Sequence, residues 1–231
     1  MKHDGVLKAL KEIVGEELAT DNEIVLAPYS YDVRELSTPT RPAGHAEFAV
    51  TPETPQQISK ILQLANKRNV LVTPVVFQTD IGENAIPVAD PVPIWFTDSK
   101  VDSNRAGAAI PVEGGIVLDL HRMNKIIEIN EDDYYAVVEP GVSMGMLERE
   151  LRSRGLWFPL PMSPPNASSV AANVLLVGIG HIGSKVGSQA DMINGLEAIL
   201  PTGEVIRGGS CAFSDSWHAK GPIPDVTGLF I

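Results

Sequence analysis

The sequence of 231 residues holds a single cysteine, Cys211, and fewer basic than acidic residues. A lone cysteine excludes an internal disulfide framework and any metal or iron–sulfur site built from cysteines alone. The 18 lysines and arginines against 29 aspartates and glutamates give a formal net charge of −11. This balance argues against nucleic acid as a partner. The histidines are scattered without the spacing of zinc-binding motifs, so the sequence predicts no metal site.

Long apolar runs are also absent. No stretch reaches the roughly 18 uninterrupted apolar residues that a membrane span requires. The first 18 residues are amphipathic and acidic, and they lack the apolar core of a signal peptide. The sequence therefore predicts no membrane span and a cytoplasmic location.

Hydrophobic periodicity predicts alternating helices and strands in the first half of the chain. An apolar stripe predicts a helix over 4–18, and AEFAV predicts a strand over 46–50. Thr54 is the expected N-cap of a helix whose first residue is Pro55. A buried strand follows over 70–76. Because a helix joins the two strands, residues 46–76 are predicted to form a parallel β-α-β unit.

The second half of the sequence predicts hairpins. Strands are expected over 114–120, 125–132 and 134–142, the last two joined by a short acidic turn. A helix is expected to start at Ser143. Two apolar runs separated by Thr-Gly predict a second hairpin over 191–209.

Gly178, Gly180 and Gly183 form a G-x-G-x-x-G pattern behind an apolar run, which is typical of an NAD-binding turn. Its helix would carry Gly183 and Gly187 in the first turns, where glycine is costly. The acidic residue at about the expected distance of 20 residues, Glu197, falls inside a predicted strand. An NAD-dependent dehydrogenase therefore stays only as an alternative.

Four blocks of sequence together resemble a known family. They are YSYDVREL, AVTPETPQQISKILQLANKRNVLVTP, AIPVEGGIVLDLHRMNKIIEINEDDYYAVVEPGV and DMINGLEAILPTGEVIRGGS. In order and spacing they are similar to the FAD-binding domain shared by p-cresol methylhydroxylase (PCMH), vanillyl-alcohol oxidase, glycolate oxidase and D-lactate dehydrogenase. The resemblance runs from about residue 26 to the end of the sequence.

The resemblance implies an α+β, PCMH-type FAD-binding fold, here truncated. A small β-α-β subdomain would pack with a mostly antiparallel sheet flanked by helices. Residues 1–45 would form an N-terminal helical arm and connector, and residues 46–231 an incomplete FAD-binding domain. A stretch at about 89–108 looks like an insertion, because AIPV occurs on both sides of it. The family's substrate-binding cap would be absent, so we assign no catalytic residue.

The resemblance also implies FAD as the cofactor and a set of residues that bind it. Glycine-rich loops suit a diphosphate because their backbone N–H groups can approach it without a Cβ atom in the way. The implied cofactor-binding residues are Thr79 and Gly82 in the diphosphate loop, Pro140, Gly141 and Val142 in a turn, Pro164 and Asn173 beside the ring system, Gly178, Gly180 and Gly183 in the glycine-rich segment, Gly187 and Asp191 of a G-x-x-x-D element, and Ile206.

The sequence departs from the family pattern in this region. The diphosphate loop, VVFQTDIGENAIP, lacks the family's arginine and first glycines, and Ala171-Ala172 replaces a Gly-Gly pair. No histidine for a covalent flavin link lies between residues 73 and 91. We expect His181 to lie in an exposed loop, Cys211 to be a buried thiol, and Tyr29 and Tyr31 to pack in the connector.

The function implied by the resemblance is the FAD-binding portion of a flavin-dependent oxidoreductase. Such enzymes oxidise a small 2-hydroxy acid or a phenolic or other alcohol by hydride transfer to FAD. The expected partners are that small-molecule substrate and either an electron-acceptor protein or the missing cap portion. A non-catalytic remnant or assembly subunit with the same fold is the main alternative, and it would follow from a loss of FAD binding.

Overall fold

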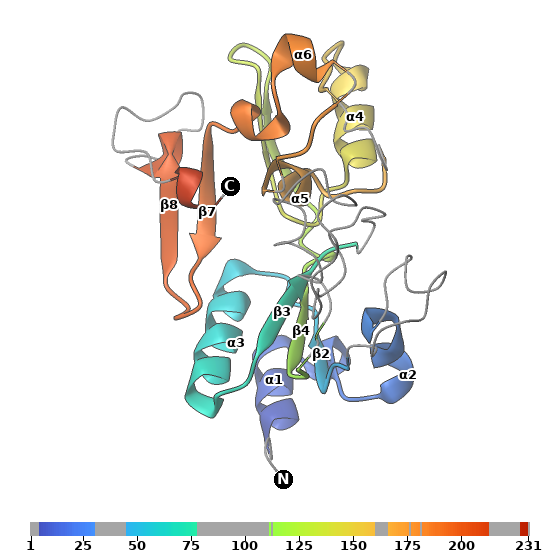
Figure 1. The fold of residues 1–231 in the computed structure, drawn as a ribbon, viewed down its shortest axis with the longest axis vertical. Coiled ribbons are helices and arrows are strands. Elements are labelled where there is room, and N and C mark those ends of the chain that lie inside the picture. Colours follow the sequence, from blue (N-terminus) through green and yellow to red (C-terminus); the bar gives the residue numbers. More distant parts are fainter. Residues whose placement is uncertain are drawn as a thin grey trace, which may run out of the picture. The chain divides into compact units, whose positions relative to one another are not determined.

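The computed structural model describes residues 5–30, 45–77, 111, 113–159, 166–175, 177–180, 182–212 and 227–230. The chain forms two compact units, Met1–Leu120 and His121–Ile231, which are described separately below (Figure 1). The helices are α1 (Val6–Val14), α2 (Glu23–Leu26), α3 (Pro55–Arg68), α4 (Met144–Ser153), α5 (Val170–Leu175) and α6 (Gly183–Val186). The strands are β1 (Ala19–Thr20), β2 (Phe48–Val50), β3 (Val72–Val75), β4 (Ile116–Asp119), β5 (Ile126–Asn130), β6 (Tyr135–Val138), β7 (Gly195–Ile199) and β8 (Val205–Gly209).

The first unit is built on a four-stranded sheet in the order β1-β2-β4-β3. Strands β2 and β3 both pair with β4 in parallel, and β1 pairs with β2 antiparallel. The predicted parallel β-α-β unit is therefore confirmed. Its two strands are not neighbours, because β4 from later in the chain lies between them.

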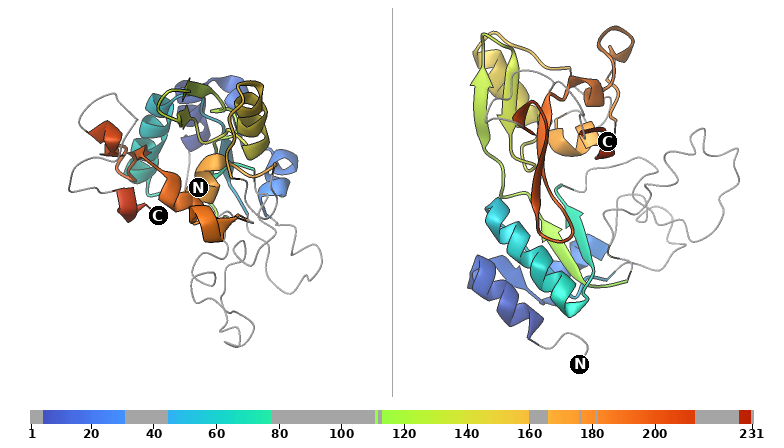
Figure 2. Two further views of the ribbon diagram at one scale, coloured as in Figure 1. Left: turned by 90° about the horizontal axis from the view of Figure 1, so that it is seen from above. Right: turned by 90° about the vertical axis from the view of Figure 1, so that its left-hand side faces the viewer.

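Helices cover both faces of this sheet. Helices α1 and α3 lie side by side on one face, and α2 lies on the other (Figures 1 and 2). All four residues of β4 are buried, as expected for a central strand packed on both sides. Leu26 of α2 joins Ala49, Val75 and Val117 in an apolar cluster on one face.

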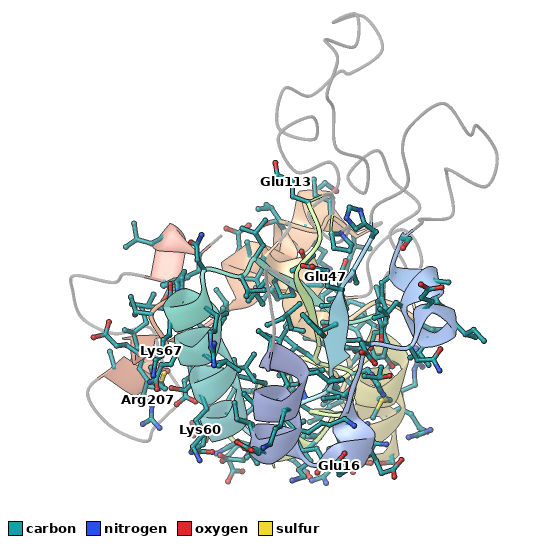
Figure 3. The ribbon with its side chains drawn as sticks, turned by 90° about the horizontal axis from the view of Figure 1, so that it is seen from below. Glu16, Glu47, Lys60, Lys67, Glu113 and Arg207 are labelled. Atoms are coloured by element: carbon teal, nitrogen blue, oxygen red, sulfur yellow. The ribbon has the colours of Figure 1, made fainter. Side chains whose placement is uncertain are left out.

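Helix α3 begins as its sequence predicts. The Thr54 hydroxyl accepts a hydrogen bond from the Gln57 backbone N–H, and the Gln57 side chain accepts one from Thr54, which completes a capping box. Pro55 occupies the first turn. The apolar positions Ile58, Ile61 and Ala65 are buried, while Lys60 and Lys67 are exposed (Figure 3). This helix therefore follows from its local sequence.

Helix α1 is shorter than the predicted helix over 4–18. It ends at Val14 because Gly15 adopts φ +107, and Glu16–Leu18 form a 3-10 turn instead. The strand β1 that follows joins the sheet, so residues 5–30 form part of the first unit.

Two glycines with positive φ directly precede β4. Gly114 and Gly115 have φ +82 and +90, and a Cβ atom on Gly115 would lie 2.4 Å from the Leu71 carbonyl oxygen. The Gly115 N–H donates to the Glu47 carboxylate at 3.0 Å. The pair thus allows three segments of the first unit to meet closely.

The second unit holds two antiparallel hairpins, β5–β6 and β7–β8. Both confirm the predicted hairpins, and within the described residues they are separate two-stranded sheets. Helix α4 starts after Ser143, as predicted, and the Ser143 hydroxyl accepts from the Met146 N–H. Its buried residues Met144, Leu147 and Leu151 form an apolar core together with Val142 and Val170.

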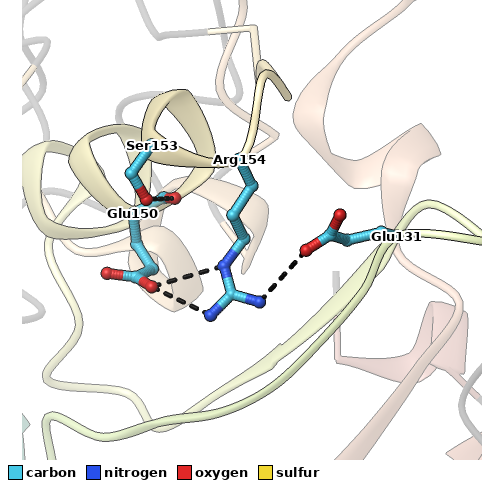
Figure 4. Close-up of polar contacts among 4 residues, drawn as sticks. All are labelled: Glu131, Glu150, Ser153 and Arg154. Carbon is cyan, nitrogen blue, oxygen red and sulfur yellow. Dashed lines mark hydrogen bonds and ion pairs between the residues drawn. The ribbon is translucent and has the colours of Figure 1, made fainter.

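An arginine joins α4 to the β5–β6 turn. The Arg154 guanidinium lies 2.9 Å from the Glu150 carboxylate and 3.3 Å from that of Glu131 (Figure 4). These side chains are well exposed, and exposed ion pairs contribute only about 0–1 kcal/mol. The core of the second unit therefore rests on the apolar face of α4.

Candidate functional site

Ser169 connects the Pro140 turn to helix α5. Its hydroxyl donates to the Pro140 carbonyl oxygen at 2.6 Å and accepts from the Ala172 N–H at 3.2 Å. The Val170 N–H also donates to the Val142 carbonyl oxygen at 3.0 Å. One predicted cofactor segment, Pro140, Gly141 and Val142, is thereby fixed against the start of α5.

Asn173 carries the connection to the end of α5. Its side-chain amide donates to the Ser169 carbonyl oxygen at 3.0 Å. The Gly178 N–H donates to the Asn173 carbonyl oxygen at 2.8 Å, and the Val177 N–H donates to that of Val174 at 3.1 Å. This is the pattern of a Schellman cap, in which one residue adopts the left-handed conformation.

That left-handed residue is Val177, with φ +55. Glycine is usual at this position, and a β-branched residue there is strained. Strain of this kind persists only where the surrounding structure enforces it, and it concentrates at ligand sites. The Val177–Gly178 turn is therefore a strained element at the centre of the predicted site.

Gln189 ties this turn to a third segment. Its backbone N–H donates to the Gly178 carbonyl oxygen at 2.8 Å, and its side-chain Nε2 donates to the Pro159 carbonyl oxygen at 3.0 Å. The residue is 1% exposed, yet its Oε1 atom accepts no hydrogen bond. A Cβ atom on Gly178 would lie 2.9 Å from Asn173 Oδ1 and 3.2 Å from Gln189 Oε1. Two amide oxygens thus face the Gly178 Cα atom.

The G-x-x-x-D element forms a local cap. The Asp191 carboxylate accepts from the Ser188 N–H and hydroxyl, both at 2.8 Å. Gly187 has φ +82, and a Cβ atom there would lie 2.7 Å from Asp191 Oδ2. The motif therefore requires glycine and aspartate for its own geometry, before any ligand is considered.

The glycine N–H groups of this region are engaged within the chain. Those of Gly141, Gly183 and Gly187 donate to the carbonyl oxygens of Met123, Gly180 and Gly183, at 2.7, 2.9 and 2.8 Å. The Gly178 and Val142 N–H groups are engaged in the same way. Hydrogen bonds and chain continuity thus connect nine of the predicted residues: Pro140, Gly141, Val142, Asn173, Gly178, Gly180, Gly183, Gly187 and Asp191.

Of the remaining predicted residues, the structure describes only Ile206. Ile206 is half-buried in β8, opposite Ala198 of β7. Thr79, Gly82 and Pro164 fall outside the described residues, as do His181, Tyr31 and the proposed insertion at about 89–108. Sequence reasoning missed Ser169 and Gln189. The S-V-A-A run that begins with Ser169 is a helix N-cap signal, whereas Gln189 has no local signal for its contacts.

The G-x-G-x-x-G segment does not have the form of an NAD-binding turn. A helix, α5, precedes it instead of a strand, and α6 after it has only four residues. Glu197 lies within β7, and its carboxylate pairs with Arg207 at 2.9 Å. A dinucleotide turn requires a strand, the glycine turn and a long helix in succession, so the NAD alternative is not supported.

Two other side chains considered in the sequence analysis, those of Cys211 and Tyr29, pack in the interior of their units. Cys211 is 1% exposed, as predicted for a buried thiol, and burial raises the pKa of the thiol. The Tyr29 hydroxyl donates to the Asp119 carboxylate at 2.6 Å, and its ring packs on the cluster of α2 and the first sheet. Burial, with the Asp119 hydrogen bond and charge, raises the pKa of Tyr29 well above its usual range.

The second unit also contains an open groove of about 370 Å³ between α4 and the β5–β6 hairpin. Ile126, Ile129 and Met146 form its apolar lining, and Arg149 and Arg154 lie among its charged groups. None of the predicted cofactor residues lines it. Among the residues described by the structure, no group of three His, Cys, Asp or Glu side chains could hold a metal ion. None of the described helices is long and apolar enough to cross a membrane.

Comparison with known proteins assigns the fold. Residues 99–209 match the family model of an FAD binding domain. The computed structure aligns with 4-ethylphenol oxidase from Gulosibacter chungangensis at a TM-score of 0.73 and 24% identity, over 99% of this chain and 40% of that one. The chain has the fold of the PCMH-type flavoproteins and carries an FAD binding domain. The predicted α+β fold of this family is confirmed, and FAD is the family's cofactor.

Sequence relatives agree with this assignment. The chain is 31% identical to an uncharacterized FAD-linked oxidoreductase of Mycobacterium tuberculosis, over 86% of this chain and 37% of that protein. It is 29% identical to the glycolate oxidase subunit GlcD of Bacillus subtilis, over 98% of this chain and 41% of that protein. It is also 29% identical to the 4-cresol dehydrogenase [hydroxylating] flavoprotein subunit of Pseudomonas putida, over 92% of this chain and 37% of that protein. The chain spans about 40% of the length of these relatives.

Two features of the second unit fit an FAD group. Gln189 Oε1 is a buried acceptor without a donor, and a ligand ring carries N–H donors. A Cβ atom on Gly178 would crowd Asn173 Oδ1 at 2.9 Å and the Asn173 carbonyl oxygen at 3.1 Å. The engaged N–H groups of Gly141, Gly178, Gly183 and Gly187 are instead poorly suited to a diphosphate. The residues present therefore fit the cofactor's rings better than its phosphates.

Proposed function

We propose that this chain supplies the FAD-binding portion of a flavin-dependent oxidoreductase. The observation that carries the proposal is the network that joins the Pro140 turn, Asn173, the Gly178 turn and Gln189 within the segment matching an FAD binding domain. In it, residues that the family resemblance implies for the cofactor share one continuous set of hydrogen bonds.

The chain's own residues would bind and orient the cofactor. Ser169 and Asn173 hold the Pro140 and Gly178 turns in fixed positions, and Val142 anchors the first turn in the core. When bound, FAD supplies the redox chemistry by accepting a hydride. We assign the diphosphate to the segment around Thr79 and Gly82, and Pro164 and Ile206 to further cofactor contacts. The domain boundary at residues 45 and 46 is also a proposal.

The substrate class is a small 2-hydroxy acid or a phenolic or other alcohol. Two relatives support these classes by name, one as a glycolate oxidase subunit and the other as a 4-cresol dehydrogenase flavoprotein subunit. Both are named as subunits, which supports further partners. We infer that such partners provide the substrate-binding portion and the electron acceptor.

The test is FAD binding by the purified chain. We expect absorbance bands at about 370 and 450 nm to remain after excess FAD is removed, with no comparable retention of NAD. FAD at 100 times its dissociation constant should also stabilise the fold by about 2.7 kcal/mol. A chain that stays colourless and gains no stability would refute the proposal and favour a non-catalytic subunit.

A pair of glycine variants links binding to the network. Gly178→Ala places a Cβ atom 2.9 Å from Asn173 Oδ1, whereas Gly228→Ala, the matched control, meets nothing within 4 Å. We expect Gly178→Ala to weaken FAD binding by roughly ten-fold, which corresponds to about 1.4 kcal/mol. Gly228→Ala should bind as the unmodified chain does. Equal affinity in both variants, with circular dichroism confirming the fold, would place the cofactor elsewhere.

A further inference from the structure

Only the nitrogen of the Gln189 side-chain amide is hydrogen-bonded; its oxygen is not. Its Nε2 group donates to the Pro159 carbonyl oxygen at 3.0 Å, which fixes the orientation of the amide plane. Its Oε1 atom is then directed away from Pro159 and accepts no hydrogen bond, although the residue is 1% exposed. A buried carbonyl oxygen without a donor is costly, and each such group in a native fold calls for an explanation.

The position of this oxygen points to a ligand. It faces the Gly178 Cα atom from the same direction as Asn173 Oδ1, so that two acceptors converge on one place in the glycine-rich segment. Neither oxygen carries a charge. Acceptors of this kind suit a neutral N–H group and not a phosphate, which is itself an acceptor.

We propose that Gln189 Oε1 accepts a hydrogen bond from a ring N–H group of the bound cofactor. This inference rests on the proposed function. FAD offers such a donor on the flavin ring and another on the adenine ring, and Gln189 is the residue that orients whichever ring lies against the Gly178 turn. The oxygen is closed to water in this structure, so binding includes a shift of that turn. The strained Val177 lies where the shift occurs.

The experiment compares Gln189→Met with Ser184→Ala in the full chain. Methionine has a similar volume and no comparable acceptor, and Ser184 is an exposed residue of α6 near Gln189 in sequence. Dissociation constants for FAD, FMN and ADP are measured for the unmodified chain and both variants. Thermal unfolding shows whether each variant remains folded.

We expect Gln189→Met to weaken FAD binding about ten-fold and Ser184→Ala to leave it unchanged. A parallel loss for FMN assigns the donor to the flavin ring, and a parallel loss for ADP assigns it to adenine. If Gln189→Met fails to fold, N3-methylated FMN and N6-dimethylated ADP serve as the probes with the unmodified chain. At least one of them should then bind about ten-fold more weakly than its parent.

Two results would overturn the inference, and they are distinguishable. If the unmodified chain binds no FAD, the proposed function and this inference fail together. If the chain binds FAD, and Gln189→Met and the methylated probes bind as well as their parents, only the role of Gln189 is wrong.

Discussion

The two units of this chain differ in the interactions that stabilise each of them internally. In the first, a mostly parallel sheet is covered by helices on both faces, and every residue of β4 is buried (Figure 1). In the second, turns are fixed by the side chains of Ser169, Asn173, Gln189 and Asp191. Apolar burial is non-directional, whereas hydrogen bonds demand fixed geometry. The predicted cofactor residues described by the structure all lie in the second unit, where precise placement matters most.

The largest expected effect is a truncation in the first unit. Ile116→Ala removes a fully buried side chain from β4, and we expect it to lower the free energy of unfolding by about 4 kcal/mol. Ile127→Ala in β5 is the matched control, because that isoleucine is 64% exposed and should cost less than about 1 kcal/mol. Urea denaturation measures both. Similar losses in the two variants would contradict a sheet stabilised by burial.

A smaller effect is expected from the polar network of the second unit. Ser169→Ala removes the donor to Pro140 and the cap of α5, so the free energy of unfolding should fall by about 2 kcal/mol. The exposed Ser184→Ala should change it by less than about 0.5 kcal/mol. If the two serine variants prove equally stable, the network contributes nothing and the contrast between the units disappears.

Local sequence predicts single helices and hairpins better than it predicts contacts between distant segments. The capping box of α3 and the hairpins are local features, and both were predictable from side-chain pattern. The insertion of β4 between β2 and β3 is a long-range pairing with no local signal. Gln189 contacts Pro159 and Gly178 only because the chain folds back on itself, so its role could not be predicted from neighbouring residues.

A third variant should act in the opposite direction. Val177→Gly places the preferred residue in the left-handed conformation at the end of α5, and we expect it to raise the free energy of unfolding by about 1 kcal/mol. A rise in melting temperature measured without ligand checks this. A loss of stability would show that packing of the Val177 side chain outweighs its backbone strain.

The last variant tests a polar contact in the first unit. Tyr29→Phe removes the hydrogen bond to Asp119 and should cost about 1 kcal/mol at neutral pH. The pKa of Tyr29 is raised in the folded chain. The contribution of the protonated Tyr29 phenol to the free energy of unfolding is therefore fully present below the unfolded pKa of about 10, and it is lost as the pH rises above that value.

The measurement is urea denaturation of both proteins between pH 7 and pH 11. The difference in stability between the unmodified chain and Tyr29→Phe should stay constant up to about pH 10 and then shrink, because phenylalanine does not ionise. A difference that is the same at every pH would mean that the phenol is not shielded by the fold.

The buried cysteine gives the second unit an internal reporter. Cys211 is the only thiol in the sequence, and its burial, together with the raised pKa of the thiol, keeps it unreactive in the folded state. Modification by a thiol reagent therefore requires a local opening of the fold around Cys211. The rate of modification counts these openings without any engineered label, and adding FAD would reveal directly whether the cofactor slows them.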